Sequence, residues 1–244
     1  MKSPLRILAA LAVFFQLPTV ATAVGAEDNW INLTLESSEV GKAPSTQPFD
    51  KGSVQTEVAS LVVTENNKVE VVKDPDFTGK ALRFTKTAPD PRTPWAILAN
   101  DPAMASSGKF RFSWEASINS FASVAKFPGF EALLNFVLLD RTGTPFFNFY
   151  YLVGRDETSG TFGSGNRKIF TPWTAGTKQK FEVDLDLDAK TATIKIDGEQ
   201  VGDPVALPPN ADGLRVVEFT DGTGIANYDG NFTATVGNFK MTQL

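Results

Sequence analysis

The chain has 244 residues, with 23 Lys and Arg against 28 Asp and Glu and a formal net charge of −5. It contains no histidine and no cysteine, which excludes a Ser-His-Asp triad, imidazole metal sites, disulfides and a thiol nucleophile. The acidic balance and the lack of Lys or Arg clusters argue against nucleic acid as a partner.

Residues 1–23 have the pattern of a secretory signal. Two basic residues precede an apolar run from Ile7 to Leu17, and small residues lead to a cleavage site after Ala23. The run is about half of the roughly 20 residues that a membrane-spanning helix needs, so we expect cleavage and no membrane span. Residues 24–244 are then expected to form a single domain that is secreted or periplasmic.

The rest of the chain alternates short strand patterns with turn residues, and no window keeps a helical period. Strands are predicted near 30–35, 54–63, 68–73, 80–86, 94–99, 109–119, 132–140, 146–153, 167–171, 179–187, 191–197, 214–220 and 231–242. This many short strands with turns between them predict an all-β fold, a two-sheet antiparallel jelly-roll sandwich.

Two of the early strands carry candidate binding residues. Trp95 follows a proline at a strand edge, where its ring can serve as a stacking platform or as a hydrophobic plug of the sandwich. In the strand 109–118 the aromatic residues alternate toward the core, which points Arg111 and Glu115 outward. These two can extend a binding groove, with the guanidinium suited to an acidic sugar or a sulfate, or they can belong to an ordinary exposed face.

The segment 133–153 predicts a hairpin around Thr142-Gly143 with one core face and one mixed face. On the mixed face Asn135 is expected opposite Tyr150, Val137 opposite Asn148, and Leu133 opposite Leu152. Amides offer a donor and an acceptor to sugar hydroxyls, and an aromatic ring covers a pyranose face. Asn135, Asn148 and Tyr150 are therefore predicted to bind carbohydrate, the alternative being that the amides bond each other or a covering loop.

The segment 181–201 reads as an antiparallel meander. Its apolar residues share one face, and Glu182, Asp184, Asp186 and Lys195 share the other. This hairpin resembles a strand pair of concanavalin A-like lectins and glucanases.

Three more segments carry the same resemblance. Asn32 to Glu36, with the loop that follows, resembles the first strand and loop of concanavalin A-like domains, including laminin-G-like ones. Gly79 to Phe84 is similar to their recurrent Gly-x-Ala-Leu strand, and Val236 to Met241 to their closing strand. In this order the segments imply the concanavalin A-like fold, without implying an activity.

The resemblance also implies a structural calcium ion where the first and last strands meet. Glu36 and Asn238 match the positions of its ligands by residue type. Calcium takes six to eight oxygen ligands, and the loop carbonyls near Glu36 can supply some of them.

Three functions follow as hypotheses. The first is a secreted, non-catalytic domain that binds a polysaccharide or glycan on a concave sheet face, through Asn135, Asn148, Tyr150, Arg111, Glu115 and Trp95. The second is an enzyme of the same fold, either a glycoside hydrolase that uses Glu182 and Asp186 or a polysaccharide lyase in which Tyr150 acts as a base beside Arg111. The alternative for the carboxylates is a solvated face that Lys195 partly neutralises. The third function is a structural or adhesive envelope protein.

Overall fold

The structure, a computed structural model, describes residues 28–87, 94–122, 131–156, 158–164, 168–220, 226–227 and 230–244. The predicted signal, residues 1–23, lies outside these ranges. Within them there is no helix, and accordingly no helix long and apolar enough to cross a membrane. The described strands form two sheets, one of nine strands and one of eight.

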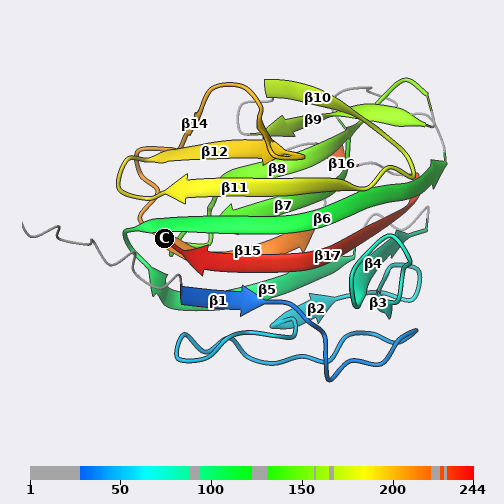
Figure 1. The fold of residues 1–244 in the computed structure, drawn as a ribbon, viewed down its shortest axis with the longest axis horizontal. Helices are drawn as coiled ribbons and strands as arrows, with labels where there is room; N and C mark the ends of the chain where they lie inside the picture. Colours follow the sequence, from blue (N-terminus) through cyan, green and yellow to red (C-terminus); the bar gives the residue numbers. More distant parts are fainter. Residues whose placement is uncertain are drawn as a thin grey trace, which may run out of the picture.

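The first sheet, here called the front sheet, faces the viewer in Figure 1. Its order is β13 (Glu199–Gln200), β12 (Thr191–Ile196), β11 (Gln179–Asp186), β6 (Lys109–Ala122), β17 (Asn231–Gln243), β4 (Ala81–Lys86) and β3 (Lys68–Val72). The short strand β14 (Val205–Ala206) pairs with β12, and β1 (Asp28–Asn32) pairs with β17. The first and last strands of the fold therefore lie side by side.

The back sheet lies behind it. Its order is β10 (Lys168–Thr174), β9 (Ser159–Ser164), β8 (Pro145–Val153), β7 (Glu131–Leu139), β15 (Leu214–Thr220), β5 (Trp95–Ala105) and β2 (Ser60–Val62). The short strand β16 (Ala226–Asn227) pairs with β7 in parallel, and every other strand pairing described is antiparallel. The two-sheet antiparallel sandwich predicted from the sequence is confirmed.

Aromatic side chains from both sheets meet in one core. Trp114 of the front sheet lies 4.6 Å from Phe136 and 5.8 Å from Phe219 of the back sheet, centroid to centroid. It also stacks on Phe181 at 5.2 Å. Each such ring contributes about 1.5–3 kcal/mol by leaving water, so this contact between the sheets is a main source of stability.

The hairpin β7–β8 has most of the predicted register. Asn135 pairs with Tyr150 and Val137 with Asn148, as expected. The predicted pairing of Leu133 with Leu152 is wrong, because the register shifts between residues 132 and 135 and places Ala132 opposite Leu152. Leu133 consequently packs in the core between the sheets.

Strand β9 was not predicted from its sequence, Ser-Gly-Thr-Phe-Gly-Ser, because glycine and serine are typical of turns. A Cβ on Gly160 would lie 2.6 Å from the Trp173 ring, and one on Gly163 would lie 2.2 Å from the Tyr150 ring. Both glycines thus give room for an aromatic ring from a neighbouring strand.

The predicted strand 54–63 is a strand only over β2. Upstream of it, Gln55 and Val58 form isolated bridges with Ile31 and Thr46. The buried carboxylate of Glu57 accepts hydrogen bonds from the Ser37 backbone N–H at 2.7 Å and from the Ser38 hydroxyl at 2.6 Å. Residues 55–58 therefore hold the loop after β1 in place through hydrogen bonds and do not extend β2 as a strand.

Candidate functional site

The predicted binding residues lie on two opposite surfaces. Trp95, Asn135, Asn148 and Tyr150 belong to the back sheet, whereas Arg111 and Glu115 belong to the front sheet. Each of them alternates with core residues of its own strand and points away from the core. The structure therefore does not bring Arg111 and Glu115 into the same site as the other four residues.

The outer surface of the back sheet carries a polar row across three strands. Thr220 of β15 pairs with Asn135 of β7, which pairs with Tyr150 of β8. Glu218, Val137 and Asn148 form a parallel second row. Side chains directly opposite in such pairs are neighbours on one face, so these residues form one surface that is polar except at Val137.

Much of this polar surface is buried. Asn135 and Tyr150 are 0% exposed and do not line an open groove, contrary to expectation. Asn148 and Trp95 are half-buried. The Tyr150 ring lies close to Gly163 on β9, which has no side chain to hold it away. Of the four predicted binding residues on the back sheet, Asn148 and Trp95 are therefore the accessible ones.

Glu218 is a functional candidate that the sequence reasoning missed. Its side chain is 2% exposed, in the middle of the apolar strand β15. Burial raises the pKa of Glu218 to about 7, and the adjacent Trp95 side chain offsets part of that effect. The sequence signal that could have identified Glu218 is a single carboxylate inside the otherwise apolar run Val216-Val217-Glu218-Phe219. Such a shifted, buried carboxyl beside a half-buried indole is typical of functional sites.

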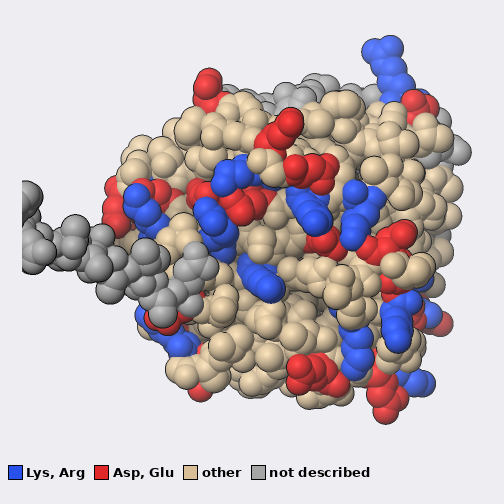
Figure 2. All heavy atoms as spheres, in the orientation of Figure 1, with Lys and Arg blue, Asp and Glu red and all other residues tan. Residues whose placement is uncertain are grey.

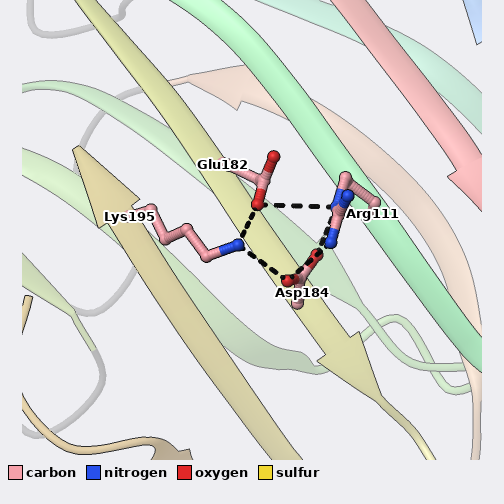
Figure 3. Close-up of polar contacts among 4 residues, drawn as sticks. All are labelled: Arg111, Glu182, Asp184 and Lys195. Atoms are coloured by element: carbon pink, nitrogen blue, oxygen red, sulfur yellow. Dashed lines mark hydrogen bonds and ion pairs between the residues drawn. The ribbon is translucent and has the colours of Figure 1, made fainter. Parts of the chain in front are cut away.

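On the front sheet, Arg111 belongs to an ionic network with neighbouring strands (Figure 3). Its Nε and Nη2 bind the two oxygens of Asp184 at 2.6 and 3.0 Å, and its Nε lies 3.5 Å from Glu182 Oε1. Lys195 on β12 binds Glu182 and lies 3.4 Å from Asp184 Oδ2. Burial alone would raise the pKa of Asp184, but Arg111 and Lys195 outweigh it and lower that pKa.

The predicted hydrolase pair belongs to the same charged surface. Glu182 is held by Lys195, and Asp186 lies 3.1 Å from the Lys109 ammonium. A backbone hydrogen bond from Ala189 lowers the pKa of Asp186, whereas a general acid needs a raised pKa. Asp186 therefore does not suit that role, and the alternative of a face partly neutralised by Lys195 describes these carboxylates better.

The two residues of the predicted lyase site, Tyr150 and Arg111, lie far apart on opposite sheets. Tyr150 is on the outer surface of the back sheet and Arg111 on that of the front sheet, with the core between them. Burial raises the pKa of the neighbouring Tyr151 phenol, which packs in the core instead.

The residues of the predicted calcium site make other contacts. The Lys80 ammonium donates to the backbone carbonyls of Leu35, Glu36 and Ser38 at 2.9, 3.1 and 2.6 Å. Asn238 donates from Nδ2 to Glu115 Oε2 at 2.9 Å. No group of three or more Asp, Glu, His or Cys among the described residues is placed to hold a metal ion. The calcium ion stays a prediction, which these contacts do not favour.

Solved structures of similar shape include a sialidase, which aligns with a TM-score of 0.53 and 17% identity. The alignment covers 75% of this chain and 16% of the sialidase. The fold is a concanavalin A-like jelly roll.

Two further similar structures are the family 7 alginate lyase AlyA1 from Zobellia galactanivorans and the family 7 alginate lyase A1-II′. AlyA1 aligns with a TM-score of 0.49 and 9% identity over 75% of this chain and 83% of its own. A1-II′ aligns with a TM-score of 0.44 and 12% identity over 75% of this chain and 85% of its own. No protein-family model matches the chain, and the comparison with curated proteins found no match. This chain thus shares a fold with the sialidase, and its function has to be argued from its own residues.

Proposed function

We propose that this protein binds carbohydrate on the outer surface of the back sheet, with Trp95 as the stacking ring. The observation that carries the proposal is the half-buried Trp95 beside the buried Glu218 carboxyl, on the same surface as Asn148. An indole ring covers the apolar face of a pyranose, and the Asn148 amide exchanges hydrogen bonds with its hydroxyls.

The pKa of Glu218 makes the charge beside Trp95 depend on pH. A carboxyl that titrates near neutrality is an acceptor when ionised and a donor when protonated. Because its side chain is 2% exposed, Glu218 does not contact the sugar itself, and that contact falls to Trp95 and Asn148. A carbohydrate ligand is also in keeping with the sialidase whose fold the chain shares, although that likeness extends to the fold alone.

Affinity electrophoresis in gels that contain soluble polysaccharides tests the proposal. We expect Trp95→Ala to abolish retardation by the polysaccharide that the wild type binds, and Trp95→Phe to keep part of it, because a smaller ring still stacks. Val40→Ala, at an exposed valine in the loop after β1, is the control for a loss of apolar surface. Retardation that is unchanged in Trp95→Ala would overturn the proposal, provided that thermal unfolding shows the variant to be folded.

An enzyme of the same fold is the second candidate, favoured by Glu218 alone. A carboxyl with a pKa of about 7 holds and releases a proton near neutral pH, as a general acid or base does. Glu218→Gln should then abolish release of reducing ends by a hydrolase, or of unsaturated products by a lyase, while polysaccharide binding persists. Product release that continues in Glu218→Gln would rule out this role.

We also propose export with removal of residues 1–23, on the basis of the signal pattern alone. N-terminal sequencing of the protein recovered from the medium or periplasm should begin at Val24.

The envelope role remains a third hypothesis. The exposed large apolar side chains in the described ranges are Val40, Val54, Val62, Val63 and Leu244.

A further inference from the structure

The outer surface of the front sheet contains a hollow that the proposed function does not use. Its volume is about 360 Å³, within the ~300–1,000 Å³ usual for small-molecule sites. Basic and acidic side chains mix on this face, over β6, β11 and β12 (Figure 2). The hollow, here called the front hollow, is lined by Ser113, Trp114, Glu115, Lys180, Phe181, Glu182, Lys195, Gly198, Asn238 and Lys240.

The register of the strands explains the hollow. Lys240 of β17 pairs with Ser113 of β6, which pairs with Glu182 of β11, which pairs with Lys195 of β12. Ser113 is the one short side chain in this row of long ones. Directly opposite side chains stand next to one another on a sheet, so the short serine leaves a depression between its neighbours.

The two carboxylates of the front hollow are already engaged. Lys195 binds Glu182, and Arg111 lies 3.5 Å from it. Glu115 accepts from Lys178 at 3.0 Å and from Asn238 at 2.9 Å. Asn238 reaches Glu115 from an irregularity in β17 between Gly237 and Lys240, where its φ is 54°. These fixed partners neutralise both carboxylates and leave them little capacity to bind another cation.

Two lysines of the front hollow remain available to a ligand. The Lys180 side chain is 70% exposed, and its ammonium is 3.9 Å from Glu115 Oε1, beyond hydrogen-bond distance. Lys240 is exposed and forms no ion pair with any residue in the described ranges. The lining contains three lysines and two glutamates, so it is locally cationic in a chain whose net charge is −5.

We infer that the front hollow is a second ligand site, which binds an acidic saccharide unit through its carboxylate or sulfate. Lys180 and Lys240 hold the anionic group, and the Ser113 hydroxyl and the Asn238 side-chain oxygen bind the sugar hydroxyls between them. The network of Arg111, Glu182, Asp184 and Lys195 fixes one wall of the site (Figure 3). The inference does not depend on Trp95, which lies on the opposite sheet.

Isothermal titration with a galacturonate trisaccharide tests this inference, with the neutral galactose trisaccharide and inorganic sulfate as comparison ligands. We expect the acidic trisaccharide to bind the wild type, with an affinity that falls as salt is raised. The double variant Lys180→Gln, Lys240→Gln should weaken this binding roughly tenfold, because two charged contacts are lost. Lys68→Gln, at an exposed lysine of β3 in the same sheet, is the matched control and should bind like the wild type.

Four outcomes would overturn the inference. They are no binding of the acidic trisaccharide, equal binding by the double variant, equal binding of the neutral trisaccharide, and sulfate binding as tight as that of the acidic trisaccharide. Trp95→Ala separates the two sites. If Trp95→Ala abolishes binding of the acidic trisaccharide and the double variant does not, this inference fails while the proposed function stands.

Discussion

Glu218 makes a single carboxyl on the back sheet sensitive to pH. Burial raises its pKa to about 7 from an ordinary value of 4.5. Between these two values the folded protein keeps a proton that the unfolded chain has released. The free energy of unfolding therefore falls as pH rises through this window, and the contribution of Glu218 is constant above it.

We expect the free energy of unfolding to fall by about 3 kcal/mol across this pH window because of Glu218. Urea unfolding at about pH 5 and about pH 8 measures it. The wild type should lose stability between these values, and Glu218→Gln should lose less, because the amide does not ionise. Glu39→Gln, at an exposed side chain, should keep the wild-type slope. An identical slope in Glu218→Gln would mean that the carboxyl is not desolvated in the folded state.

Gly163 determines where the Tyr150 ring can lie. A Cβ at this position would be 2.2 Å from the Tyr150 Cε2 atom, which forces the ring or the strand to move. We expect Gly163→Ala to cost about 1–3 kcal/mol of stability, as overpacked sites do. In a Tyr150→Ala background the same change should cost little, because the clash is gone.

Thermal unfolding of the four proteins completes that double-mutant cycle. Gly52→Ala is the control for adding a methyl group, since its Cβ would lie no closer than 3.4 Å to a neighbouring atom. Additive costs of Gly163→Ala and Tyr150→Ala would show that the two residues do not contact each other.

The site residues were partly predictable from the sequence. Alternation placed Asn135, Asn148 and Tyr150 on one face, since the face of a side chain depends only on its position in the strand. The burial of Asn135 and Tyr150 was not predictable, because alternation gives the face on which a side chain lies and not what packs over that face. Arg111 was assigned to the wrong surface for a related reason. The pattern of β6 gives its outward face but not the sheet to which β6 belongs.

At the level of elements, periodicity predicted the strands whose two faces differ. In β6, β11 and β12 polar side chains alternate with buried apolar ones along most of the strand, and the predicted bounds were close. β9 lacked this contrast because its glycines have no side chains to alternate. The pairing shift in β7 was not predictable either, since it leaves no mark in the apolar sequence Ala132-Leu133-Leu134.

Lys80 connects the start of β4 to the loop after β1. Its ammonium binds three backbone carbonyls of that loop, as a bound cation would. We expect Lys80→Met to lower the free energy of unfolding by about 1.5–3 kcal/mol, because hydrogen bonds to a charged group are lost. Chemical denaturation measures the change, and Lys73→Met, at an exposed lysine, is the control.

The same contacts bear on the predicted calcium ion. We expect EDTA to leave the unfolding temperature of the wild type unchanged, because Lys80 already supplies a positive charge to the carbonyls near Glu36. A fall in unfolding temperature that added calcium reverses, and that Glu36→Gln or Asn238→Ala removes, would establish the calcium site instead.

For the whole molecule, β17 is the strand on which the front sheet depends. It pairs with β6 along most of its length, with β4 over its first half and with β1 over its second half. Phe239 and Met241 of its second half are fully buried in the core between the sheets. The last strand thus joins the beginning of the fold to the middle of the chain.

Deleting residues 238–244 should therefore prevent stable folding. The deletion removes two fully buried side chains, each contributing about 1.5–3 kcal/mol, and leaves β1 without its strand partner. The two side chains alone account for about 3–6 kcal/mol, which reaches the lower end of the total stability of a typical domain, about 5–15 kcal/mol. Far-UV circular dichroism and urea unfolding of the truncated protein should show no cooperative transition. Removal of Leu244 alone, whose side chain is 49% exposed, should keep a cooperative transition near that of the wild type. If the longer deletion also unfolds cooperatively, the sandwich does not need the pairing of its first and last strands.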